Sequence, residues 1–286
     1  MDETKKDPLG SAWMIIAALL FTVMNVVLKA ANQQFGYQGG ELVFWRMVFS
    51  VAVLGGMALA QGKTFRTPHI KAHLNRSISG TVAMLCIFYA IVHLPLATGV
   101  TLSYTSSIFL ALLSLIVLRE KISWYTQAVL VFGFAGVVLL LNPSFQNGQE
   151  LAGIIGLFGG LLSGWAYLQV RELSLLGEPG WRVVFYFSAV GMLIAAAWAS
   201  WQGWTPLSWA AAPYLLAIGA SAMLAQLAMT RAYKVGQKFT VASLAYLTVV
   251  FSSLTGVFLF GDVLDWREWL GMAVIIASGI LSGLKK

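Results

Sequence analysis

The chain has 286 residues, of which 59% are apolar and only 10% are charged, and its formal net charge is +7. Soluble domains carry about 25% charged residues, and a mean hydropathy of +0.79 cannot be hidden inside a globular core of this size. These values exclude an ordinary soluble protein. The single cysteine, Cys86, also excludes an intrachain disulfide.

Apolar stretches of about twenty residues, the length that spans a bilayer, recur along the whole chain. They predict an all-α polytopic membrane protein that is embedded in the lipid bilayer. We expect ten transmembrane helices, at about 10–34, 41–60, 75–94, 97–118, 122–141, 151–173, 181–201, 210–232, 239–260 and 266–284.

The basic residues predict the orientation. If the N-terminus is cytoplasmic, 15 of the 18 lysines and arginines fall in cytoplasmic segments, Arg76 and Arg171 among them, and only Arg267 falls in an outer loop. Because positive residues stay on the cytoplasmic side, we expect both termini in the cytoplasm of a multi-pass protein of the plasma (inner) membrane. Topology thus explains the basic charge, and no nucleic-acid partner is expected.

Three polar residues lie inside the first two predicted helices, where such residues are costly and are candidates for function. Asn25 and Lys29 are four residues apart and share one helix face. Lys29 either faces a water-filled cavity or snorkels to the outer interface, and Asn25, one turn deeper, favours the cavity. Arg46 either pairs with another helix or meets a substrate carboxylate. Glu41, five residues earlier on the same helix, is poorly placed to pair with it.

Aromatic side chains with polar tips give a second group of candidates, because a buried O–H or N–H needs a partner. Each of them either packs in the core or faces a cavity. Gln226 is either a substrate contact or a hydrogen-bonding contact between helices. The full set of candidate substrate-binding residues is Asn25, Lys29, Arg46, Tyr89, Tyr104, Trp165, Gln226 and Tyr246.

Glycines recur every four residues in the sixth helix, at Gly156, Gly160 and Gly164. Such a stripe lets helices approach closely, so it predicts either tight packing or a sliding surface.

The two halves of the chain resemble each other. A shift of 142 residues without a gap pairs leucines, threonines, tryptophans and the tyrosines Tyr104 and Tyr246. Each half holds five predicted spans, and an odd number makes the second half enter the membrane from the opposite side. We therefore expect two inverted repeats, 9–141 and 151–284, an arrangement typical of secondary transporters.

Five stretches carry a resemblance to a known family: "FWRMVFSVAVL" (44–54), "EKISWYTQAVLVFGFAGVVLL" (120–140), "SGWAYLQVREL" (163–173), "LAQLAMTRAYKVGQKFTVASLAYLTVVFSSLTGVFLFGD" (224–262) and "FGDVLDWREWLGMAVIIASGILSGL" (260–284). The sequence resembles the EamA-type transporters of the drug/metabolite transporter superfamily over essentially its whole length. This resemblance implies ten helices in two inverted five-helix repeats. The family often has a proline in the fourth and ninth helices, and this chain has none there.

The residues disfavour catalysis. The chain has no phosphate-binding glycine motif, and its three histidines and one cysteine offer no metal cluster, so we expect no cofactor and no catalytic or metal site. A membrane enzyme or a non-transporting receptor is the remote alternative.

We expect a secondary transporter that moves a small amphipathic metabolite by alternating access. Amino acids, aromatic ones especially, and efflux are favoured by the resemblance. Uptake or exchange of a larger metabolite, such as a nucleoside, a vitamin or S-adenosylmethionine, stays open, and the oligomeric state is not predicted.

Overall fold

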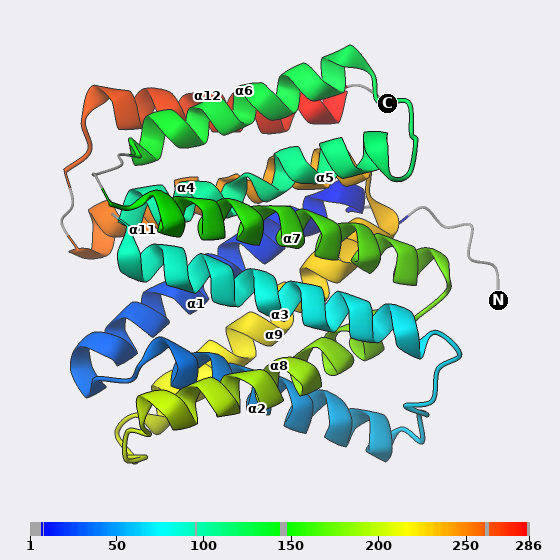
Figure 1. Cartoon of the computed structure of the whole chain (residues 1–286), viewed down its shortest axis with the longest axis vertical. Helices are drawn as coiled ribbons and strands as arrows, with labels where there is room; N and C mark the ends of the chain where they lie inside the picture. The colour runs from blue at the N-terminus through cyan, green and yellow to red at the C-terminus, as the bar shows by residue number, and fades with distance from the viewer. Residues whose placement is uncertain (1–6, 8, 95, 144–147, 261–262, 285–286) are drawn as a thin grey trace.

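The computed structural model describes residue 7 and residues 9–94, 96–143, 148–260 and 263–284. Every regular element in these ranges is helical (Figure 1). The first half contains η1 (Gly10–Ala12), α1 (Trp13–Phe35), α2 (Gly39–Ala60), α3 (Ile70–His93), α4 (Leu96–Tyr104), α5 (Ser106–Ile116) and α6 (Trp124–Leu141). The second half contains α7 (Glu150–Leu175), α8 (Gly180–Gln202), α9 (Ala212–Val235), α10 (Lys238–Ala245), α11 (Leu247–Thr255), the π-helical turn η2 (Gly256–Phe260) and α12 (Trp266–Leu284).

The helices have the dimensions of membrane spans. In the part of the chain that the structure describes, nine helical stretches are long and apolar enough to cross a bilayer. The tenth predicted span, 75–94, lies in α3, which is less apolar because its first half contains His73, Arg76, Ser77 and Ser79. All four of these side chains are buried. The all-helical, polytopic fold predicted from the sequence is confirmed.

The second half repeats the helix pattern of the first. Helix α9 (Ala212–Val235) begins and ends 142 residues after α3 (Ile70–His93). Helices α1 and α7 run in opposite directions across the bundle, and α1 begins at the same end where α12 finishes (Figure 1). We call this the N-terminal end of the bundle. The pairs α6–α12 and α2–α8 lie at its two opposite edges (Figure 1).

Two predicted spans are broken, which corrects the expectation of continuous helices at 97–118 and 239–260. The first breaks at Thr105, between α4 and α5, and the second at Tyr246, between α10 and α11. At the first break both the backbone N–H (3.2 Å) and the hydroxyl (2.6 Å) of Thr105 donate to the Leu102 carbonyl. At the second, the Tyr246 N–H donates to the Ser243 carbonyl at 3.2 Å. Such i to i−3 bonds tighten the turn and interrupt the α-helical ladder without a proline.

The glycine stripe of α7 packs directly on the first broken helix. A Cβ at Gly160 would lie 2.8 Å from the Leu102 carbonyl oxygen, and one at Gly164 would lie 2.9 Å from that of Ser106. Both distances are too short for a side chain, so the glycines bring α7 against the backbone at the break. The tight packing predicted for this stripe is confirmed.

Helices α6 and α12 approach each other in the same way. A Cβ at Gly271 of α12 would lie 2.6 Å from the Leu140 backbone nitrogen and 2.8 Å from the Gly136 carbonyl oxygen of α6. Because the obstructing atoms belong to the backbone, they cannot move aside as a flexible side chain can.

We therefore expect Gly271→Val to push α6 and α12 apart and to lower the free energy of unfolding by about 2–3 kcal/mol, a typical effect of overpacking. Thermal unfolding of the purified protein in detergent measures it. Gly283→Val is the matched control on the same helix, since nothing lies within 4 Å of a Cβ there. Equal unfolding temperatures for the two variants would contradict this account of the α6–α12 contact.

Candidate functional site

A cavity of about 300 Å³ lies between the two halves of the bundle, within the usual range for small-molecule sites. Helices from both repeats form its wall. Its polar and aromatic lining includes Asn25, Arg46, Arg76, Tyr104, Tyr167, Gln226 and Thr248. Among the described residues that line it, none is acidic.

The cavity is closed at the N-terminal end and opens toward the other end. Met14 and Arg76, which line it near the start of α1 and α3, are each 4% exposed. Farther along the same helices the lining becomes accessible: Asn25 is exposed and Phe88 is half-buried. One mouth is therefore open while the other is sealed.

Aromatic and arginine contacts make the seal. The Tyr167 and Tyr233 rings stack with centroids 5.5 Å apart. The Arg171 guanidinium, half-buried, donates from Nη1 to the carbonyls of Tyr233 (3.0 Å) and Gly236 (3.1 Å) at the end of α9. Carbonyls at a helix C-terminus lack intrahelical partners and attract a cation, so Arg171 fastens α7 to α9 there.

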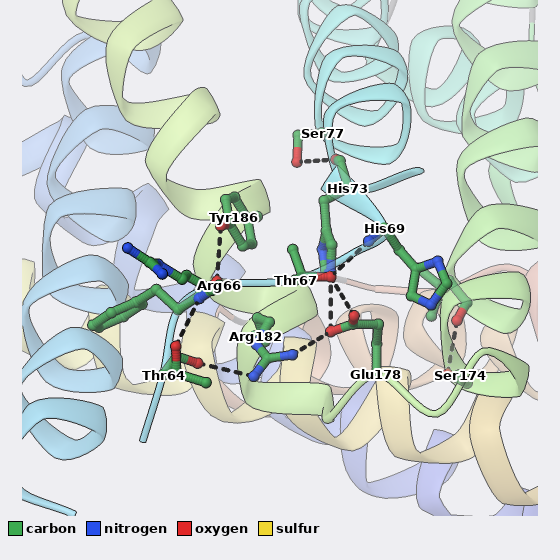
Figure 2. A network of polar contacts seen from close by, with 12 residues as sticks. Thr64, Arg66, Thr67, His69, His73, Ser77, Ser174, Glu178, Arg182 and Tyr186 are labelled. Atoms are coloured by element: carbon green, nitrogen blue, oxygen red, sulfur yellow. Dashed lines mark hydrogen bonds and ion pairs between the residues drawn. The ribbon is translucent and has the colours of Figure 1, made fainter. Parts of the chain in front are cut away.

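A second polar network lies beside the seal and ties the α2–α3 loop to α8 (Figure 2). Its centre is the buried Glu178 carboxylate, which accepts from Thr67 and from Arg182 at 2.8 Å and lies 3.2 Å from His73 Nε2. Arg182 in turn donates to the Thr64 carbonyl at 2.9 Å. Burial disfavours the charged form of Glu178, yet the hydrogen bonds from Thr67 and Arg182, together with the contact with His73, outweigh it and hold the pKa of this carboxyl below its ordinary value. Glu178 is therefore an ionised group whose hydrogen-bonding capacity is largely used.

Arg46 of α2 lines the cavity and is 9% exposed. Its Nη1 approaches the Met24 sulfur at 3.7 Å, which is a weak acceptor. Glu41 is engaged elsewhere, because it accepts from the Thr205 hydroxyl at 2.7 Å and from the Gln38 N–H at 3.1 Å. In the described part of the chain no ion pair involves Arg46. The sequence left two roles open for Arg46, an ion pair with another helix or a contact with a substrate carboxylate. This conformation does not show the ion pair.

Arg76 of α3 is a second guanidinium in the same cavity, and the sequence analysis did not select it. Its carbon Cζ lies 4.3 Å from the centre of the Phe187 ring. Its Nε and Nη1 atoms are buried without a hydrogen-bond partner among the described residues. The positive-inside count had assigned Arg76 to a cytoplasmic segment. The available signal was its spacing, since Arg76, Gly80, Met84 and Phe88 recur every four residues and all line the cavity.

The predicted site residues divide into two groups of four. Asn25, Arg46, Tyr104 and Gln226 come together in the lining. Lys29 is exposed one turn beyond Asn25, and Trp165 packs against the main apolar core. Neither of these two belongs to the described lining.

The other two candidates are aromatic residues that also lie off the lining. Tyr89 is 37% exposed and stacks on His93, with centroids 4.0 Å apart. Tyr246 is fully buried behind the cavity wall, where its ring meets that of Tyr104 edge-on at 6.1 Å. The pseudo-symmetric tyrosines are therefore in contact, with one facing the cavity and the other the core.

Comparison with known proteins gives matches along the whole chain. The sequence model of the EamA-like transporter family matches residues 8–142 and again 151–284. The pseudopaline exporter of Pseudomonas aeruginosa is 28% identical over 97% of both chains. The riboflavin transporter of Vibrio cholerae is 28% identical over 96% of this chain and 93% of its own. A crystal structure aligns with a TM-score of 0.82 over 96% of both chains at 17% identity, which shows the fold.

A pH-dependent contact holds the start of the chain against the sealed end. Arg231 of α9 donates to Asp7 at 2.6 Å, and the Trp13 indole and the Leu9 N–H donate to the other carboxylate oxygen at 3.1 Å each. The hydrogen bond from Arg231, with those from Trp13 and Leu9, holds the pKa of Asp7 below its ordinary value of 3.8. A depressed carboxyl pKa stabilises the folded state above the ordinary pKa, and this stabilisation is lost as pH falls through the lowered value.

We therefore expect Asp7→Asn to lower the unfolding temperature by about 1–3 °C at pH 6–7, as befits an ion pair at the surface. The difference from wild type should shrink as the pH falls through the ordinary carboxyl pKa of 3.8 and vanish only below the lowered pKa of Asp7, where the wild-type side chain also loses its charge. Thermal unfolding across this pH range measures it, with Asp265→Asn in the α11–α12 region as a control carboxylate. A wild-type advantage that does not change with pH would contradict the assigned contact.

Proposed function

Because the chain belongs to the EamA-like transporter family, we propose that it is a secondary transporter that moves a small amphipathic metabolite by alternating access. An amino acid, with aromatic ones favoured, is the proposed substrate. The family and the relatives described above are transporters, so the chain is a multi-pass membrane transporter and not an enzyme.

The single observation that supports this substrate is the composition of the cavity wall. Phe21, Met84 and Phe88 supply apolar and aromatic surface, and Arg46 supplies a buried cation without a described carboxylate partner. A guanidinium binds a carboxylate through paired N–H donors. A molecule with an apolar or aromatic body and a carboxylate matches both parts of the wall, and Asn25 and Gln226 offer further hydrogen bonds.

The asymmetric cavity supports alternating access. One end is sealed by Arg171 and the tyrosine stack while the other is open, which is the geometry of one end-state of such a cycle. We place the N-terminal end of the bundle, which is the sealed end, on the cytoplasmic side of the plasma (inner) membrane. The cavity in this conformation then opens to the outside of the cell. The described lining contains no carboxylate that could relay a proton, which favours facilitated diffusion or exchange.

Efflux is the proposed direction, and the similarity to an exporter supports it. Uptake of a larger metabolite such as a vitamin is the second candidate, because the riboflavin transporter is equally similar at 28% identity. Transport of labelled substrate into and out of right-side-out vesicles would separate the two directions.

Counterflow in liposomes tests the proposed substrate. Vesicles that contain the purified protein and unlabelled phenylalanine should accumulate labelled phenylalanine transiently, and Arg46→Gln should reduce the initial rate about tenfold or more, since a hydrogen-bonded charge is lost. Arg267→Gln, which removes an exposed arginine, is the control and should transport at the wild-type rate. Accumulation no greater than in protein-free vesicles would rule out aromatic amino acids as substrates.

A further inference from the structure

We propose that Arg76 binds a second acidic group of the transported molecule, so that the substrates are small molecules with an acidic group at each end. This inference rests on the proposed transport function and narrows its substrate class. It assigns one anionic group to Arg46 and the other to Arg76.

The geometry of Arg76 supports a ligand-binding role. The side chain is 4% exposed and lines the cavity beside Phe187, Tyr167 and Ser163. The Phe187 ring supports one face of the guanidinium and leaves its in-plane N–H groups for other partners. Nε and Nη1 are buried without hydrogen-bond partners in the described part of the chain, so the protein does not satisfy this guanidinium and a planar acidic group at the cavity would supply the missing acceptor.

A buried cation is stable only with compensation. Removing an ionised group from water costs several kcal/mol unless an opposite charge or hydrogen bonds replace the water. The buried Glu178 does not fill this role, because it contacts Thr67, His73 and Arg182 instead. Arg171 and Arg231 are turned to the α9 carbonyls and to Asp7. Arg76 differs from them because its Nε and Nη1 atoms lack a described hydrogen-bond acceptor, and a bound anion supplies one.

Gly80 keeps the space for this guanidinium. A Cβ at Gly80 would collide with Arg76 Nη1 and would lie 3.2 Å from the Phe187 ring. The glycine, one helical turn after Arg76, therefore allows the arginine to fold back along α3 toward Phe187. If Arg76 only anchored the cytoplasmic end of α3 at the membrane surface, its guanidinium would not need the space that Gly80 leaves beside Phe187 in the cavity wall.

Arg46 and Arg76 lie on different helices and in different surroundings. Arg46 on α2 neighbours Met24 of α1, whereas Arg76 on α3 neighbours Phe187 of α8. Both line one continuous cavity of about 300 Å³. Two separate cations in one cavity without an acidic lining residue match a ligand with two separate acidic groups better than one with a single carboxylate.

The test compares acids with their amides, which have nearly the same size but lack one charge. The purified full chain is heated in detergent at low salt with two matched pairs: 4-carboxyphenylalanine against 4-carbamoylphenylalanine, and succinate against succinamate. Ligands that bind the folded protein raise its unfolding temperature, and titration of this shift gives the affinity. Wild type should prefer the acid of a pair about tenfold or more.

Arg76→Gln should abolish this preference by weakening only the binding of the acid, and Arg76→Lys should retain part of it because the charge remains. Arg66→Gln removes one positive charge from the exposed α2–α3 loop and should keep the wild-type preference. The proposal is overturned if wild type binds acid and amide equally in both pairs, if no acid shifts its unfolding temperature, or if Arg76→Gln keeps the preference.

The two pairs separate this inference from the proposed substrate. If the aromatic pair produces no shift while succinate is preferred over succinamate through Arg76, the aromatic amino-acid assignment fails and the two-acid class stands. If phenylalanine is transported but neither acid is preferred over its amide, transport stands and the role of Arg76 falls.

Discussion

Positive charge without a matching negative charge is the constraint around which this bundle is organised. Two guanidinium groups, those of Arg46 and Arg76, are almost entirely buried among helices whose outer surfaces are apolar. In a low-dielectric interior such charges need water or an anion nearby. The described structure meets this need with a cavity rather than with acidic side chains, and the buried carboxylates Glu41 and Glu178 are hydrogen-bonded to other groups. A site that lacks its own counter-charge favours a ligand that brings one.

The proposed alternating access would depend on related features in the two halves of the chain. Both halves contain a helix that is broken within one residue of the matching position, and the breaks meet where Ser107 donates to the Ala242 carbonyl at 3.0 Å. Arg171 seals the N-terminal end by bonding to the C-terminus of α9, and Lys29, which lies 142 residues earlier, occupies the equivalent position on α1 at the open end. In inverted repeats, which the sequence predicts for the two halves, a contact that closes one end has a counterpart at the other. The proposed alternating-access cycle would use this relation to reach two related end-states.

The sequence predicted the fold to a large extent because hydropathy, loop charge and a constant repeat offset are properties of long segments. The sequence also predicted that Asn25, Arg46, Tyr104 and Gln226 face a cavity, since a polar group within an apolar span has few other uses, and these four residues line the cavity. The positions of the aromatic residues were harder to predict, because aromatic side chains occur both on the helix faces that line the cavity and on the helix faces that pack in the core. Trp165 and Tyr246 lie on faces that pack in the core. Arg76 was missed because a basic residue near a cytoplasmic helix end satisfies the positive-inside rule whether its side chain points to water or into the bundle. The helix breaks were missed because i to i−3 hydrogen bonds at Thr105 and Tyr246 leave no proline as a marker.

The central claim is that this cavity is a water-filled path for the substrate. Thiol labelling tests it most directly, in a Cys86→Ser background with a single new cysteine at Asn25 and, as the control, at Leu207 in the exposed α8–α9 loop. The account predicts that a membrane-impermeant maleimide labels both positions, and that a transported substrate slows labelling at position 25 but not at position 207. Labelling at position 207 alone, or labelling at position 25 that substrate does not slow, would contradict it.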